Sequence, residues 1–151
     1  MAAATDARKK DPFRGFRFLV QIGGITSAGF REVSGLDIAT DTVDYREGDD
    51  PRLTISKLPG LRKYANLILK RGITDDKQLW EWRNKILKGE IQDTRKSIQI
   101  ILQDIDGNAT AEWHCLEAWP SSWSGPHFNA TASEVAIETL EISHEGLERV
   151  K

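Results

Sequence analysis

Three groups of residues have the types, and at first sight the spacing, that a metal site or a nucleophile would need. Asp104, Asp106 and Asn108 alternate like the first ligands of a calcium loop. However, Ala109 stands where such a loop requires glycine, and Cys115 stands where it requires its distal glutamate. The segment is better explained as the tight turn of a β-hairpin, since an Asp-Gly-Asn run readily adopts the positive φ angles of such turns.

The second and third groups also lack the geometry for chemistry. On a regular strand, Glu138 and His144 face one side and Glu141 faces the other, so the three predict a charged surface rather than a metal site. His114 and Cys115 are neighbours, and neighbours on a strand point to opposite faces. They therefore cannot form a nucleophile–base pair, and Cys115 is predicted to be a buried structural thiol.

Tryptophans form the remaining candidate for a binding site. Trp113, Trp119 and Trp123 could form a stacking platform for a sugar or a nucleic acid. The acidic balance of the chain disfavours nucleic acid, and tryptophan is enriched in buried contacts between subunits, so core and interface packing is preferred. The sequence contains no Gly-rich phosphate loop, paired catalytic carboxylates or triad spacing. We expect no enzymatic activity, no cofactor and no bound metal.

Composition limits the class of protein. A chain of 151 residues suffices for one domain with its own core. Hydrophobic residues make up 39% and charged residues 29%, as in water-soluble globular proteins, and the net charge of −2 provides no basic field for nucleic acid or an anionic membrane. A single cysteine excludes an internal disulfide. Residues 1–12 lack the apolar core of a signal peptide, so we expect folding in the cytoplasm. No apolar run approaches the ~20 residues that a membrane helix needs, so we expect no membrane span.

The first half of the chain reads mainly as strands. Alternation over residues 16–22 predicts a strand with one buried face, followed by a turn at the two glycines 23–24. A second strand is expected over residues 25–34, with a bulge near Gly29. A third strand is expected over residues 38–45, with at least one polar face.

A long loop and one helix follow. Residues 46–60 contain two prolines, two glycines and mixed charges, and a loop of this length inside a compact domain usually has a function. A short strand is predicted over 64–71. A helix is predicted from an N-cap within residues 74–76 to Lys88, with Gly89 as its C-terminal cap. Its apolar stripe is Leu79, Trp82 and Ile86, and its polar face includes Lys77, Glu81, Lys85 and Lys88.

The remaining strands complete the expected fold. Residues 98–102 and 109–119 should form a hairpin, and a break over 120–129 should precede a last strand over 134–143. The sum is a mainly β protein: an antiparallel β-barrel or sandwich of six to seven strands with one packed α-helix. Residues 1–12 are expected to form a flexible arm and residues 13–151 a single domain.

Several segments, taken together and in order, resemble the tail-tube proteins of contractile-tailed phages and the inner-tube proteins of extracellular contractile injection systems. They are DPFRGFRFLVQIGG from Asp11, the run from Phe30 to Leu36, the Val43-x-Tyr45-Arg46-Glu47-Gly48 motif, Lys57-Leu58-Pro59-Gly60, Lys63-Tyr64, Leu69-Lys70-Arg71-Gly72, Leu79-Trp80-x-Trp82, Ala118-Trp119-Pro120, Asn129-Ala130-Thr131 and the closing GLER run. The resemblance covers Asp11 to Lys151, and its specificity lies in the combination.

The resemblance implies a β-barrel subunit of hexameric rings that stack into a hollow tube inside a contractile sheath, with the same fold as Hcp. Sheath contraction would drive the tube through a target envelope. Implied partners are further copies of the chain, the sheath, baseplate or spike proteins and tube-terminating proteins, with cargo in the lumen and DNA only in a phage tail. The implied mature location is a phage tail or an injection-system particle.

The same resemblance gives expectations for individual residues. The loop would contact the next ring, through the residues Arg46, Glu47, Gly48, Asp49, Asp50, Pro51 and Arg52. The polar helix face, with Lys77, Glu81, Lys85 and Lys88, could meet the sheath. Two alternatives stay open: an Hcp-like tube protein of type VI secretion, and, in a different class, a β-barrel that binds a small ligand.

Overall fold

The computed structural model describes residues 11–25 and 29–151, so most of the predicted N-terminal arm (residues 1–12) lies outside the described residues. In chain order the elements are β1 (Phe18–Ile22), β2 (Glu32–Ser34), β3 (Ile38–Tyr45), β4 (Ser56–Tyr64), β5 (Leu67–Gly72), α2 (Gln78–Leu87), α3 (Ile91–Thr94), β6 (Lys96–Gln103), β7 (Ala109–Ser124), β8 (Ile137–Ser143) and β9 (Gly146–Arg149). The predicted mainly antiparallel β class is confirmed, with a second, short helix that the sequence did not reveal.

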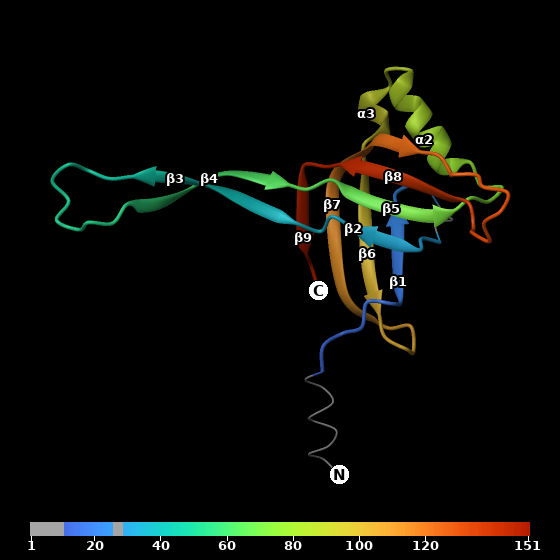
Figure 1. The fold of residues 1–151 in the computed structure, drawn as a ribbon, viewed down its shortest axis with the longest axis horizontal. Helices are drawn as coiled ribbons and strands as arrows, with labels where there is room; N and C mark the ends of the chain where they lie inside the picture. Colours follow the sequence, from blue (N-terminus) through green and yellow to red (C-terminus); the bar gives the residue numbers. More distant parts are fainter. Residues whose placement is uncertain (1–10, 26–28) are drawn as a thin grey trace, which may run out of the picture.

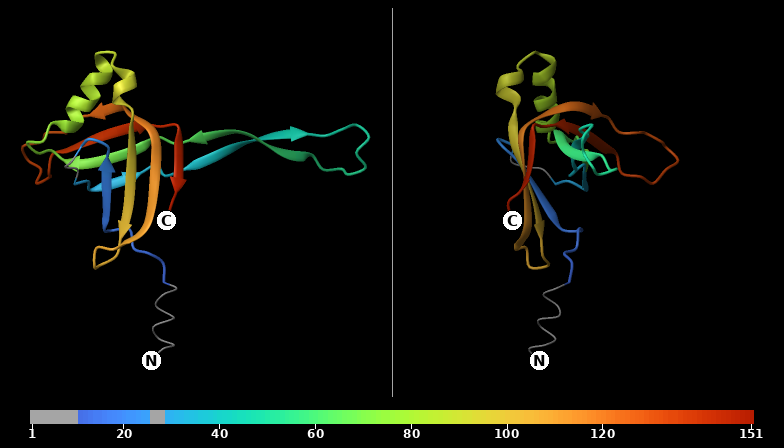
Figure 2. Two further views of the ribbon diagram at one scale, coloured as in Figure 1. Left: turned by 180° about the vertical axis from the view of Figure 1, so that it is seen from behind. Right: turned by 90° about the vertical axis from the view of Figure 1, so that its left-hand side faces the viewer.

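One sheet forms the body of the molecule. Its strand order is β1-β6-β7-β8-β5-β2, β9 also pairs with β7, and every pairing is antiparallel. The long strand β7 pairs with β6 and β9 along its first part and with β8 along its last part. The sheet therefore folds into two halves whose strands cross (Figures 1 and 2). Because β1 and β2 are not hydrogen-bonded to each other, the barrel stays open between them.

The core lies between the two halves. Period-two alternation places Val20 and Ile22 of β1 and Leu67 and Leu69 of β5 inside, each no more than 3% exposed. Helix α2 adds Leu79 and Trp82 from its predicted stripe. The indole Nε1–H of Trp82 donates to the carbonyl oxygen of Thr94 at 2.6 Å, which fixes α3 to α2.

The N-terminal hairpin prediction needs correction. The turn after β1 is present, with Gly24 at φ +78°, but β1 begins at Phe18 and Phe16 is 69% exposed. The expected strand over 25–34 is reduced to Glu32–Ser34, and it pairs with β5 rather than with β1. The bulge predicted near Gly29 adjoins residues 26–28, which lie outside the described residues. Local alternation could not reveal this distant partner.

The predicted break at Pro120 is also wrong, because β7 continues through Pro120 to Ser124. Pro120 is fully buried opposite Ile142, and the register slips directly after it. Such an irregularity accommodates a residue that has no N–H for the ladder. The last predicted strand is shorter, Ile137–Ser143, and a ninth strand, Gly146–Arg149, follows it.

The helix prediction is correct in its stripe and its end but not in its start. Helix α2 begins at Gln78, whose backbone N–H donates to Oδ1 of Asp76 at 2.9 Å. Thr74 accepts from the backbone N–H of Asp76, so this pair orders the segment before the helix. Gly89 has a φ of +84° and its N–H donates to the carbonyl oxygen of Ile86 at 3.0 Å, as the predicted cap requires.

A buried ion pair joins β5 to β8, and it corrects the prediction of a charged surface around Glu138. Arg71 and Glu138 face each other in the register, are 4% and 7% exposed, and are hydrogen-bonded through Nε and Oε1. Trp123 of β7 donates to the other carboxylate oxygen at 3.1 Å, and Arg71 also donates to the carbonyl of Asp76 at 3.0 Å. The pair thus links three strands to the start of α2.

Replacing Glu138 by alanine should lower the free energy of unfolding by about 3 kcal/mol, because the buried Arg71 guanidinium then keeps only Asp76, at 3.5 Å, of its two carboxylate partners. Glu148→Ala, at an exposed position of β9, is the matched control and should change stability by less than about 0.5 kcal/mol. Urea unfolding followed by tryptophan fluorescence measures both. Equal stability of the two variants would show that the pair contributes nothing.

Candidate assembly surface

A two-stranded arm made of β3 and β4 projects from the body, as Figures 1 and 2 show. The two strands form a separate sheet, with pairing from Ile38–Tyr64 near the body to Tyr45–Ser56 near the tip. The predicted strand over 38–45 is confirmed exactly, but the predicted loop over 46–60 is wrong at its end. Only residues 46–55 lie between the strands, because residues 56–60 belong to β4, which pairs with β3. The short strand predicted over 64–71 is in fact β5, Leu67–Gly72.

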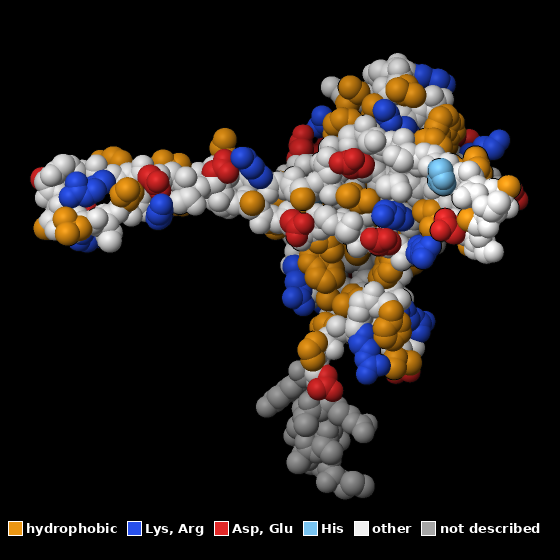
Figure 3. Space-filling model, viewed as in Figure 1, with side chains coloured by type: hydrophobic (Ala, Val, Ile, Leu, Met, Phe, Trp, Pro, Cys, Tyr) orange, Lys and Arg blue, Asp and Glu red, His pale blue; other side chains and the backbone are white. Residues whose placement is uncertain are grey.

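The arm has two chemically different faces, because residues opposite each other in an antiparallel pair share a face. On one face Val43 lies opposite Leu58, and Tyr45 follows two residues along. Leu61 shares this face, since its neighbour Arg62, opposite Thr40, faces the other way. These four residues, the apolar stripe, are between 45% and 78% exposed. Figure 3 shows hydrophobic side chains exposed along the arm among charged ones.

The opposite face of the arm is polar. Asp44 and Lys57 face each other there and form an ion pair with a 2.7 Å Oδ1–Nζ distance. Thr42 and Thr40 continue this face toward the body. Both charged side chains are more than half exposed, so the pair stabilises the arm by no more than about 1 kcal/mol. The arm therefore depends on other contacts to cover its apolar stripe.

The tip of the arm holds its own shape through hydrogen bonds between its charged residues. The guanidinium of Arg46 donates to the carbonyl oxygens of Asp50, at 3.0 Å, and of Arg52, at 3.2 Å. Asp50 accepts from both the side chain and the backbone N–H of Arg52. The Arg52 side chain, and then its backbone N–H, hold the pKa of the Asp50 carboxyl below its usual value. Glu47 accepts a further bond from the hydroxyl of Tyr45 at 3.0 Å.

The structure brings the predicted stacking residues together at this tip, at the far end of the arm from the body. Leu53, which the sequence places in the same loop, is 95% exposed beside them. The remaining residues of that set, Gly48, Asp49 and Pro51, are exposed as well. The tip thus exposes charges of both signs together with one leucine, and opposite charges can pair with complementary groups on another surface.

The root of the arm is fixed by backbone contacts that only glycine permits. Gly35 has a φ of +91°, and a Cβ at this position would stand 2.1 Å from the carbonyl oxygen of Asn66. The Asn66 side chain in turn donates to Glu141 at 2.9 Å and accepts from Ser143 at 3.3 Å, both in β8. His144 hydrogen-bonds the carbonyl oxygen of Ala65 at 3.0 Å. The direction of the arm is thus set by β8.

The residues predicted on the polar face of the helix occupy a second exposed surface. Lys77, Glu81, Lys85 and Lys88 are all exposed in and around α2. On the side of α2 toward β7, Trp80 packs edge-on against Trp123 with ring centroids 4.8 Å apart. This contact and the buried Trp82 hold the helix against the sheet, so its charged residues point away from the core.

The groups with possible chemistry are used structurally. Cys115 is fully buried, and desolvation raises the pKa of its thiol to about 11, so the predicted structural thiol is confirmed. His114 points the other way and bonds to Glu112 at 2.9 Å. Asp104 closes the β6–β7 turn by accepting from the backbone N–H of Asn108 at 2.9 Å, as predicted. Among the described residues no group of three or more His, Cys, Asp or Glu side chains could hold a metal ion.

The tryptophans that contact the core agree with the prediction that they serve packing and not the stacking of a ligand. Trp113 and Trp123 pack against the core cluster, and Trp119 is half-buried in β7. The guanidinium of Arg149 in β9 lies 5.5 Å from the ring centre of Trp113. Among the described residues, neither helix has the length and apolar composition that crossing a bilayer requires.

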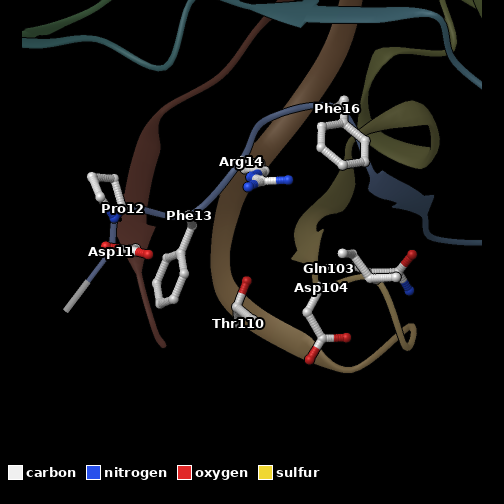
Figure 4. A pocket seen from close by; sticks show the side chains of 9 residues that line it. Asp11, Pro12, Phe13, Arg14, Phe16, Gln103, Asp104 and Thr110 are labelled. Carbon is white, nitrogen blue, oxygen red and sulfur yellow. The ribbon is translucent and has the colours of Figure 1, made fainter. Parts of the chain in front are cut away.

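A hollow of about 430 Å³ lies at the opposite end of the body from α2, between the N-terminal segment and the β6–β7 hairpin. Figure 4 shows Phe13 beside Thr110, with Gln103 and Asp104 across the hollow. Phe13 and Phe16 are 57% and 69% exposed, so the hollow is an open surface with large apolar side chains on its edge. Such a surface suits protein contact better than the capture of a small molecule.

The described residues form an open antiparallel barrel with a projecting two-stranded arm. The family model described as T4-like virus tail tube protein gp19 matches residues 14–148. The chain belongs to this tail tube family. No match is found among curated proteins.

Chains in solved structures of contractile injection systems are similar to this chain in sequence and in fold. A chain in the sheath-tube complex of the extracellular contractile injection system PVC, in the extended state, is 28% identical, with a TM-score of 0.84 over 96% of this chain and 95% of that chain. A chain in the tube-terminating cap of the anti-feeding prophage is 30% identical, with a TM-score of 0.81 over 93% and 91%. Hcp1 from Flavobacterium johnsoniae, 15% identical with a TM-score of 0.53 over 88% and 94%, shares the fold.

Replacing Gly35 by alanine should destabilise the protein by more than about 2 kcal/mol. Alanine would have to adopt a positive φ angle, and its Cβ would overlap with the carbonyl oxygen of Asn66. Gly48→Ala is the control, since its added Cβ would meet nothing within 4 Å. Thermal unfolding followed by circular dichroism measures both. Matching melting temperatures for the two variants would contradict this account of the root.

Proposed function

We propose that this chain is the non-enzymatic subunit of a hollow inner tube, assembled from stacked hexameric rings inside a contractile sheath. Sheath contraction drives the assembled tube through a target envelope. The observation that carries the proposal is the arm: a two-stranded ribbon with an exposed apolar stripe, attached rigidly to a barrel that is itself open. An isolated two-stranded ribbon is marginal in water, so this one requires a partner surface.

Membership of the tail tube family and the likeness to chains in a sheath-tube complex and a tube-terminating cap support this proposal. The assemblies that contain these chains include a sheath, a tube terminator and, for a chain 22% identical, a baseplate, and we propose the same partners here by analogy. We further propose assembly in the bacterial cytoplasm, before the particle is completed.

Two surfaces are assigned roles within this proposal. The tip residues Arg46 to Arg52 contact the next ring, because they lie at the far end of the arm and offer both signs of charge. The exposed residues Lys77, Glu81, Lys85 and Lys88 meet the sheath, because α2 presents them away from the core. An Hcp-like tube of type VI secretion remains the second candidate, supported at the level of the shared fold.

Negative-stain electron microscopy of the concentrated, purified chain tests the proposal directly. We expect rings with a central hole, and tubes of the same width at higher concentration. A protein that stays monomeric by analytical ultracentrifugation at every concentration and salt tested would refute the proposal.

Deleting Asp49 to Thr54 should leave folded protein and rings but prevent long tubes, because it removes most of the tip between β3 and β4. Circular dichroism checks the fold, and tube length is measured on micrographs. Replacing the same six residues by glycine and serine is the matched control. It keeps the length of the loop but removes the native side chains, so it separates the effect of loop length from that of the side chains. Tubes of ordinary length in the deletion variant would contradict a role in stacking.

A further inference from the structure

The apolar stripe of the arm has a receptor on this same chain. We propose that the stripe (Val43, Tyr45, Leu58 and Leu61) docks in the open mouth of the barrel of a second copy, between β1 and β2. This inference rests on the proposed function and adds the surface that the arm binds. It concerns the shaft of the arm, not its tip.

The mouth of the barrel is an apolar groove. It has a volume of about 320 Å³, and Phe18, Ile100, Leu102 and Trp113 line it from β1, β6 and β7, opposite Val33 and Leu36. Four of these side chains, namely Phe18, Val33, Leu36 and Trp113, pack against the core while staying partly exposed. The groove is therefore the uncovered end of the core itself, where β1 and β2 lack a connecting ladder.

The arm cannot fill the groove of its own chain. It leaves the body directly after β2 and points away from it, as Figures 1 and 2 show. The root contacts between Gly35 and Asn66, and between Asn66 and β8, hold it in that direction. A second copy must therefore supply the arm that reaches this groove.

Residues 1–10 of the same chain are the competing occupant. Their sequence, MAAATDARKK, contains small and charged residues, with Met1 the one large apolar side chain. The stripe offers a tyrosine, a valine and two leucines on one face. Burying four large apolar side chains in an apolar groove releases far more ordered water than burying alanines, so the arm is the better match.

The charges around both surfaces are compatible with docking. Arg31 and Glu32 stand at the groove, while Asp41 and Lys63 flank the stripe as an ion pair with a 3.2 Å distance. Each surface thus carries both signs, and a docked arm can form opposite-sign contacts at the edge of the groove. An arm that binds a different site on the next copy makes a heterologous contact, which generates rings or helical stacks rather than closed dimers.

Disulfide trapping in the full-length chain tests the inference. The double variant Leu58→Cys with Val33→Cys places one thiol on the stripe and one in the groove. The two positions cannot meet within one chain, because Leu58 pairs with Val43 in the arm, which projects away from the body that holds Val33 (Figure 1). Oxidation of assembled tubes should convert most chains into a ladder of covalent oligomers on a non-reducing gel.

The matched control is Thr42→Cys with Val33→Cys, because Thr42 lies on the polar face of the same arm. It should stay monomeric on the gel. Tyr45→Cys with Val33→Cys provides a second stripe position if Leu58→Cys fails to assemble. Cys115 remains in all variants, since it is fully buried.

Each outcome decides between the hypotheses. A ladder for the stripe variants alone supports docking in the groove. Tubes without a ladder, or an equal ladder for Thr42→Cys, would overturn the inference and leave the proposed tube intact. An intramolecular link between Thr5→Cys and Val33→Cys would show that the N-terminal residues fill the groove, and would also overturn it. Failure of the unmodified chain to assemble at all refutes the proposed function instead.

Discussion

Uncovered apolar surface on the arm and at the mouth of the barrel is the constraint on which the behaviour of this protein depends. The arm cannot bury its stripe because two strands provide only one layer, and the barrel cannot close because β1 and β2 end the sheet without pairing. Apolar area exposed to water costs free energy in proportion to its size. Docking of the arm of one copy in the barrel mouth of another would cover both apolar surfaces at once. Association would then bury surface that a single chain leaves exposed to water.

Rigidity at the root of the arm makes this completion specific. The contact between Gly35 and Asn66 and the hydrogen bonds to β8 fix the direction of the arm before any partner is present. A pre-ordered element loses less conformational entropy on binding than a mobile one. The buried pair of Arg71 and Glu138 acts similarly within the body, since it joins β5, β7 and β8 to the segment before α2.

The sequence predicted those features that depend on local pattern. Strand β3, the stripe of α2, the cap at Gly89 and the turn at Asp104 to Asn108 all follow from periodicity or from glycine placement. The resemblance of ordered motifs predicted the family. Features that depend on distant partners were missed: the pairing of β2 with β5, the passage of β7 through buried Pro120, and the ninth strand.

The arm shows the same limit at the candidate site. Prolines, glycines and charges in residues 46–60 suggested a loop, yet Lys57 to Gly60 lie in a strand because β3 is available to pair with them. The buried carboxylate of Glu138 was misassigned to the surface, since nothing near it in sequence indicates that Arg71 lies opposite. Local patterns report exposure only where the partner strand is known.

The placement of the single thiol has a consequence for a polymer of many copies. Every subunit contributes one cysteine, which lies in β7 between β6 and β9, is fully buried and has its pKa raised by desolvation to about 11. Its thiolate is scarce at neutral pH, so exchange and oxidation are slow. A tube built from this chain would therefore resist random cross-linking of its subunits under oxidising conditions, and a cysteine engineered on its surface would be the one site available to maleimide dyes.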